Sequence, residues 1–335
     1  MAVQGFVRLR KHQFGKQTSF SSNASATRAL PYRGAIVYDP QRELPDVDTG
    51  SIDPILAFFN GAASITSSLE GKAAYNDMPY LWSALAKGGV TATGATAYTW
   101  TYQAASLTAD PFEYYTHEWG DDAQNIIGGA SVIDSAELSF DDSLAAFNVR
   151  EDWISARALF GTGLTGGLTV DSSPTWMYGA DTEVYLDTVY TSIGTTKLSD
   201  TIRGVSVQIN NNLDQKRYAN GSNTRFQLAG YGRGEREILV TITCEEQAAV
   251  LTEVATLDDD PVPNRYIEIR TTSPVIITGS TPYSQSIRIP ARLAQAPEYG
   301  EIGGNATITL TYRGYYSSDL GYALRAVVVN TLATL

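Results

Sequence analysis

The sequence has few of the residues that build metal and disulfide chemistry. Its 335 residues include one Cys and two His. One Cys excludes an intramolecular disulfide framework and a Cys-rich metal site, and two His exclude a three-His metal centre. No apolar run reaches the roughly 18 residues that a membrane span needs. The opening residues also lack the apolar segment of a signal peptide. We therefore expect no metal, no cofactor and no membrane binding.

Positive charge is also scarce, and it is unevenly placed. The chain has 24 Lys and Arg against 36 Asp and Glu, a net charge of −12. The first 38 residues contain six of the cations and no acid, so the remainder, with 18 cations and all 36 acids, carries −18. Such an acidic body does not suit a protein that grips nucleic acid, because phosphate binding needs clustered Lys and Arg.

These charges predict a basic N-terminal arm, residues 1–34, on an acidic body. Six charges over this length are sparse for a nucleic-acid tail, so we expect the arm to contact an acidic neighbouring copy of the chain. The candidate contact residues between subunits or between rings are Arg8, Arg10, Lys11, Lys16 and Arg28.

The residues that are present favour β-structure. Hydrophobic residues make up 43% of the chain, enough for a packed core, and the 20 Tyr with frequent Thr, Ser and Gly are typical of strands and turns. Two-residue alternation predicts strands, most clearly at 98–102, 136–140, 205–209, 238–242 and 306–312. Helices are predicted over 80–87, after Pro79, and over 245–257, where Thr243 and Glu246 would form a capping box.

The two halves of the sequence show a weak duplication. Arg33-Gly34 and the strand after it match Arg203-Gly204 at an offset of 170, and the two predicted helices match at a similar offset. The strand 136–140 matches 308–312 at an offset of 172. We interpret the chain as module 1 (35–160) and module 2 (175–335), two copies of one β-rich module with a single helix, joined by a Gly/Ser/Thr-rich linker (161–174).

No catalytic pattern stands out. His117 is interpreted as a packed or solvated strand residue, and Cys244 as a small buried residue. The Gly-rich segment at 161–167 lacks the ending of a phosphate loop, and the spacing of a calcium loop is absent. Acidic groups abound, and a glycosidase would bring two of them together. We expect no enzyme, and we assign the acidic clusters to an acidic surface or a channel lining: Asp141, Asp142, Asp258, Asp259 and Asp260.

Several segments, in this order, resemble one protein family. FGKQTSFSSNASATRALPYRG, SITSSLEGKAAYNDMPYLWSAL, YTWTY and DSAELSFD are similar to segments of the major tail tube proteins of long-tailed, siphovirus-type bacteriophages. RGVSVQINNNLDQKRYANG and REILVTITCEEQAAV resemble the second module of such a protein. The likeness covers most of the chain, and it lies in pattern and order rather than in one signature.

The resemblance implies a fold and an assembly. Each module would be a β-sandwich with a flanking α-helix, and the inner strands of a ring of modules would close into one β-barrel around a channel. From the duplication we expect a trimeric ring with pseudo-six-fold symmetry, with a hexamer as the alternative. Stacked rings would form the virion's tail tube, assembled in the host cytoplasm. Its partners would be the tape measure protein, the tail terminator and tail-tip proteins, and genomic DNA in passage.

Two other functions remain open from the sequence. One is a different virion component, such as a capsid or head-completion protein. The other is a carbohydrate-binding or glycosidase β-domain, in which the aromatic strand at 98–102 would serve as a platform for sugars. Aromatic residues on strands are also common in cores and interfaces.

Overall fold

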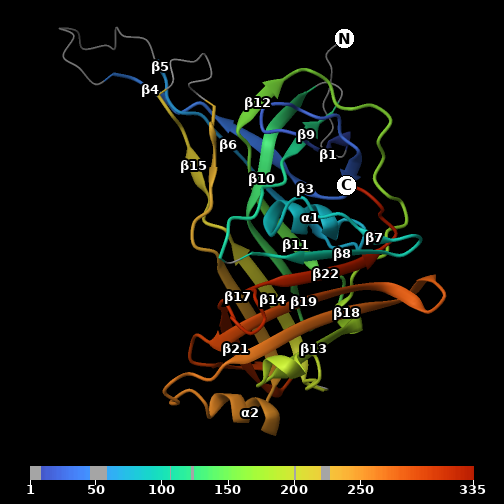
Figure 1. Ribbon diagram of the computed structural model, residues 1–335, viewed down its shortest axis with the longest axis vertical. Coiled ribbons are helices and arrows are strands. Elements are labelled where there is room, and N and C mark those ends of the chain that lie inside the picture. The colour runs from blue at the N-terminus through green and yellow to red at the C-terminus, as the bar shows by residue number, and fades with distance from the viewer. Residues whose placement is uncertain (1–8, 46–58, 106, 122–123, 200, 220–226) are drawn as a thin grey trace.

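The computed structural model describes residues 9–45, 59–105, 107–121, 124–199, 201–219 and 227–335 (Figure 1). It is mainly β, and all strand pairs between named strands are antiparallel. The described helices are α1 (Met78–Leu85), α2 (Ala248–Val254) and two single 3-10 turns, Gly179–Asp181 and Tyr190–Ser192. The strands are β1 (Lys11–Lys16), β2 (Arg28–Leu30), β3 (Arg33–Asp39), β4 (Arg42–Glu43), β5 (Phe59–Asn60), β6 (Ser64–Lys72), β7 (Thr93–Gly94), β8 (Tyr98–Gln103), β9 (Tyr115–Gly120), β10 (Asn125–Phe140), β11 (Asn148–Ile154), β12 (Arg157–Phe160), β13 (Thr182–Asp187), β14 (Ile202–Asn210), β15 (Asp214–Lys216), β16 (Gly230–Gly232), β17 (Glu237–Glu245), β18 (Arg265–Thr278), β19 (Thr281–Leu293), β20 (Glu298–Ile302), β21 (Asn305–Gly314) and β22 (Arg325–Asn330).

Eight strands form the long sheet, in the order β3-β6-β11-β10-β14-β17-β21-β20. Its strands alternate because one face packs on the core and the other faces outward. On β14, for example, Val205, Val207 and Ile209 are buried while Gln208 is exposed. The long sheet takes strands from both halves of the chain, and β10 and β14 meet at its centre.

The second layer consists of two smaller sheets. The cover sheet has the order β13-β18-β19-β22-β8-β7, and the small sheet has the order β2-β1-β9-β10-β12. In Figure 1 the strands β18, β19 and β22 run across the direction of β14 and β17 behind them. The layers therefore pack as a sandwich.

Strand β10 belongs to both layers. Its first half pairs with β9 and β12, and its second half pairs with β11 and β14. The change falls at irregularities between Gly128 and Ser131 and between Ile133 and Ser135. Ala130 there has a φ of 50°, which is uncommon for a residue with a side chain. Such bulges bend a strand and let it pass from one sheet to another.

Among the described residues, the pairings branch but never return to their starting strand. The long sheet therefore ends in two edges, β3 and β20. Each of these strands has one partner, β6 for β3 and β21 for β20.

One hydrophobic core runs through both halves of the chain. It contains α1, whose eight residues MPYLWSAL are all buried, with Pro at its first turn. The helix lies between the sheets, where every side is covered. Tyr102 Oη donates to the Pro79 carbonyl at 3.1 Å, which ties the start of α1 to the cover sheet.

The predicted strands are confirmed, and the helix signals are confirmed in part. The strands predicted at 98–102, 136–140, 205–209, 238–242 and 306–312 all lie within observed strands. The capping box is wrong, because Thr243 is still in β17 and the residue preceding α2 is Gln247, which makes no side-chain cap. The second helix is accordingly shorter than the predicted 245–257.

Candidate functional site

The outward face of the long sheet is polar, and we call it the polar face. Hydroxyl side chains stand in rows across neighbouring strands. Ser139, Ser206, Thr241 and Thr311 are successive cross-strand neighbours on β10, β14, β17 and β21. Thr243 and Thr309 lie beside this row, with their hydroxyls 3.1 Å apart. Short hydroxyls make a smooth, hydrated surface that carries no net charge.

The charges on the polar face alternate in sign. One row reads Arg33, Glu70, Arg150 and Glu137 on β3, β6, β11 and β10. Opposite charges on neighbouring strands are favourable, whereas like charges there would be destabilising. Arg150 also lies 3.8 Å from Asp152. The polar face is therefore not the strongly acidic surface that the net charge suggested.

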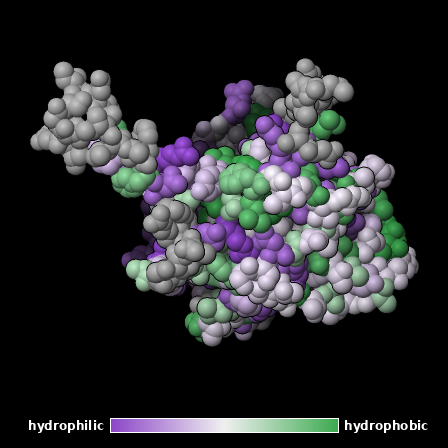
Figure 2. All heavy atoms as spheres, turned by 90° about the horizontal axis from the view of Figure 1, so that it is seen from above, coloured by the Kyte–Doolittle hydropathy of each residue, from purple (hydrophilic) through white to green (hydrophobic). Residues whose placement is uncertain are grey.

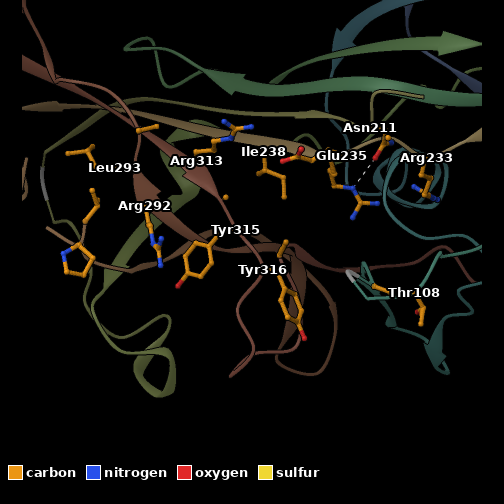
Figure 3. Close-up of a pocket in the computed structure, with 18 of the residues that line it drawn as sticks. Thr108, Asn211, Arg233, Glu235, Ile238, Arg292, Leu293, Arg313, Tyr315 and Tyr316 are labelled. Atoms are coloured by element: carbon orange, nitrogen blue, oxygen red, sulfur yellow. Dashed lines mark hydrogen bonds between the residues drawn. The ribbon is translucent and has the colours of Figure 1, made fainter. Parts of the chain in front are cut away.

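A cleft of about 960 Å³ lies where β14 and β21 end and β17 begins. Its lining comes from several segments that are far apart in the sequence (Figure 3), and it includes Arg233, Arg236, Arg292, Arg313, Tyr315 and Tyr316. Figure 3 shows Arg292, Tyr315 and Tyr316 extending into the same open space. Seen from above, hydrophilic and hydrophobic residues are interspersed over the molecule (Figure 2).

The arginines of the cleft differ in how they are held. Arg236 donates from Nε to Asn211 Oδ1 at 3.0 Å, and burial lowers its pKa to about 10. Arg233 stacks on the Phe112 ring at 4.3 Å, and burial lowers its pKa also. Arg292 lies 4.8 Å from the centre of the Tyr315 ring. This end of the sheet therefore presents cations and aromatic rings together.

The predicted basic arm is largely part of the fold. Residues 11–16 form β1, which pairs with both β2 and β9. Strand β1 was not predicted, because its four buried residues include the polar His12 and Gln13, so it shows neither alternation nor an apolar run. The expectation of a free arm is therefore wrong for these residues, and Arg8 lies outside the described residues.

The other four predicted contact residues find partners within their own chain. Arg28 binds the buried Asp77 at 2.7 Å, and Lys16 lies 2.9 Å from Glu113. Arg10 lies 3.9 Å from Asp121, and Lys11 donates to the Leu168 carbonyl at 3.3 Å. Contact between copies through these residues stays a prediction, and these partners do not favour it.

The two predicted acidic clusters lie at opposite ends of the long sheet. Asp141 and Asp142 occupy the turn between β10 and β11, where hydrogen bonds from Ser143 lower the pKa of Asp141. Asp258, Asp259 and Asp260 follow α2 and are exposed, and Asp260 lines the cleft. Neither cluster is on a strand of the polar face. Sequence proximity of acids could not show this, because their placement depends on the loops that carry them.

The structure brings the two histidines together, which the sequence analysis missed. His12 Nδ1 lies 3.1 Å from His117 Nε2, and His117 Nδ1 lies 3.3 Å from Ser67 Oγ. Burial lowers the pKa of His12 to about 4, and it also lowers the pKa of His117 well below its usual value. His117 is stacked on Phe14 in the interior. All of these side chains are buried, so a substrate cannot reach a Ser–His pair here. His117 is packed, as predicted.

Two other candidates also belong to the core. Cys244 is fully buried, and burial raises the pKa of its thiol to about 12, which agrees with a small buried residue. Trp100 and Tyr102 on β8 are buried as well, and the Trp100 Nε1 donates to the Leu332 carbonyl at 3.0 Å. The aromatic strand at 98–102 therefore cannot act as a platform for sugars through these two residues.

Glu151 on β11 is a buried carboxyl group beside Tyr32 and Asp77, and burial raises its pKa to about 8. The folded state therefore holds a proton that the unfolded state releases above about pH 4.5. It follows that the free energy of unfolding decreases as pH rises from about 4.5 to 8.

We expect Glu151→Gln to remove this decrease in the free energy of unfolding with rising pH. The amide oxygen can still accept the Trp153 Nε1 hydrogen bond, now 2.8 Å long. Stability at pH 8 relative to pH 5 should increase by about 2–4 kcal/mol, since one pKa unit corresponds to about 1.4 kcal/mol. Urea unfolding at the two pH values measures the effect, with the exposed Glu70→Gln as the control. Equal pH dependence in Glu151→Gln and wild type would contradict a buried neutral carboxyl.

Among the described residues, no helix is long and apolar enough to cross a membrane, and no group of three or more His, Cys, Asp or Glu is placed to hold a metal ion. Neither the comparison with family models nor that with curated proteins gives a match to this sequence.

Proposed function

We propose that this protein is a tail tube subunit of a long-tailed bacteriophage, a structural protein of the virion that polymerises as stacked rings and conducts the genome. The observation that carries the proposal is the long sheet with its two free edges. A free edge is a template for pairing with another chain. A ring in which β20 of each copy pairs with β3 of the next leaves no such edge and forms a closed barrel.

The proposal includes two copies of one module in each chain, and the strand order supports it. In the first half the order β3-β6-β11-β10 contains the hairpin β10–β11, and α1 follows β6. In the second half the order β14-β17-β21-β20 contains the hairpin β20–β21, and α2 follows β17. The second layer has the same strand order in both halves, β1-β9-β10-β12 in the first and β13-β18-β19-β22 in the second.

This correspondence changes one of the sequence matches. The strand 136–140, at the end of β10, corresponds to β20, whereas 308–312 lies in β21, which corresponds to β11. The other two sequence matches, near residues 33 and 203 and between the two helices, agree with the strand correspondence.

The junction between the halves is a template for the contact between copies. In the chain, β10 pairs with β14 from Ser135↔Asn210 to Phe140↔Val205. Because β20 is equivalent to β10 and β3 is equivalent to β14, the same antiparallel contact would join β20 to β3 of the next copy. Three copies would then close a ring of six modules, and the hexamer remains the alternative count.

One side chain on β20 supports this contact. Leu138 on β10 faces Val207 across the junction and is 2% exposed. The burial pattern of the paired strands equates Leu138 with Tyr299 on β20, and Tyr299 is 68% exposed. A large aromatic side chain on a free edge strand gains much burial when a strand is added beside it.

In such a ring the polar face would line the channel. Hydroxyls and alternating charges offer DNA no cluster of unpaired cations, so phosphates are not held by counterion release. This revises our expectation that acidic clusters line the channel. DNA would slide because the wall is hydrated and its cations alternate with acids across neighbouring strands, and repulsion by a strongly negative wall is not required.

The test is the assembly state of the purified protein. We expect negative-stain microscopy to show rings or tubes with a central hole, and light scattering to give three copies per ring. A monomer at every concentration, or a closed shell, would overturn the proposal. A shell would favour a capsid role.

A further inference from the structure

The cleft has an occupied counterpart within the same chain. The segment between β14 and β17 carries the β15–β16 hairpin, whose Tyr231 packs against the first half. Tyr231 Oη donates to the carbonyls of Ala130 at 2.8 Å and Ile154 at 3.2 Å. Its ring lies 5.9 Å from that of Phe112. The second half thus covers one end of the first.

The strand correspondence places the cleft at the equivalent end of the second half. Ile154 ends β11, and Gly314 ends β21. Ala130 precedes the part of β10 that belongs to the long sheet, and Ala294 precedes β20. Phe112 comes just before β9, as Val262 comes just before β18. Gly314, Ala294 and Val262 all line the cleft. The site that Tyr231 fills in the first half is therefore open in the second.

The equivalent hairpin in the first half is β4–β5, between β3 and β6. In Figure 1 these strands stand away from the body at the upper left. Exposed apolar side chains lie here: Phe59 on β5 is 50% exposed, and Leu44, directly after β4, is 37% exposed. Asp39 ends β3 and Glu43 ends β4, and their carboxylates are opposite in charge to Arg292 and Arg313 of the cleft, of which Arg313 also lies 3.5 Å from Glu237.

We infer that the cleft binds the base of the β4–β5 hairpin of a second copy of this chain. The inference rests on the proposed ring, because only the β20–β3 contact brings the neighbour's hairpin to this end of the sheet. Phe59 would enter the cleft beside Tyr315 as Tyr231 packs beside Phe112. The contact adds side-chain recognition to backbone pairing, so that each ring closes with one register.

Cross-linking between two chains, each with one added cysteine, tests the inference. Asn60→Cys and Ala294→Cys are both at exposed positions, and the native Cys244 is buried. The chains are purified separately, mixed and oxidised. We expect a disulfide between positions 60 and 294, identified by mass spectrometry of the linked peptides. Its yield should be at least tenfold above that of the same mixture with Phe59→Asp in the first chain.

A second mixture, Val37→Cys with Glu298→Cys, reports separately on the β20–β3 contact. If this edge mixture cross-links and the cleft mixture does not, the cleft inference is overturned while the ring stands. If neither mixture cross-links, both fail. A cross-link in the cleft mixture alone would overturn the inference as stated, because it would show docking of a second copy without the β20–β3 contact.

Discussion

Glu301→Pro is expected to abolish ring and tube formation while the monomer still folds. The turn Gly303-Gly304 places the pairs Ile302↔Asn305 and Gly300↔Thr307 in hydrogen-bonded positions, so the Glu301 N–H points away from β21. Proline removes this N–H without breaking the β20–β21 ladder, and edge strands tolerate proline on their solvent side.

The effect should be large because closure of the proposed ring would repeat the lost contact at every copy. Sedimentation velocity should show monomer at concentrations at least tenfold above those at which wild type assembles, with an unchanged urea midpoint. Glu301→Ala, which keeps the N–H, is the matched control and should assemble like wild type. Rings formed equally well by Glu301→Pro would show that β20 is not a closing edge.

Lys substitutions on the polar face are expected to make the wall of the proposed channel bind DNA. Ser206, Thr241 and Thr311 are neighbours in one row of this face, and a ring of three copies would carry nine added cations if each became Lys. Each phosphate neutralised adds to the affinity and to its salt dependence. We expect assembled tubes of the triple variant to retain double-stranded DNA at least tenfold more strongly than wild type at low salt, with the difference lost at high salt.

The control places the same charge elsewhere. Ser173, Thr252 and Ser318 are exposed and lie outside the strands of the long sheet, and their triple Lys variant has the same net charge. Retention in a filter assay by both variants alike would mean that DNA binds an outer surface. A polar-face variant that releases DNA as readily as wild type would show that this face does not meet the DNA.

The structure explains which elements were readable from the sequence. Strands with one core face, such as β14 and β17, alternate and were predicted well. Strand β1 was missed because it buries the polar side chains of His12 and Gln13 as well as Phe14, so KHQFGK shows no alternation of apolar and polar residues. The helix α2 was overextended because the strand β17 continues through Thr243 to Glu245, where pairing with β21 outweighs a local capping signal.

The positions of the candidate site residues depended on the tertiary structure even more than the secondary-structure elements did. His12 and His117 are far apart in the sequence and form one buried pair, because β1 pairs with β9. Asp141 and Asp260, in contrast, lie at opposite ends of a sheet. Hydrogen-bond register, not sequence spacing, sets these distances. The cleft likewise gathers residues between Ala105 and Ala323, a set that no motif links.

The sequence by itself determined the β class, the positions of the alternating strands and the exclusion of an intramolecular disulfide. Composition and two-residue periodicity are local properties, so they can be read along a chain. Only the tertiary structure decided that the halves share one core and one sheet, that the N-terminal cations are paired within the fold, and that β3 and β20 are left as edges. Those facts depend on long-range pairing, because whether a strand is central or an edge is set by its neighbours in space.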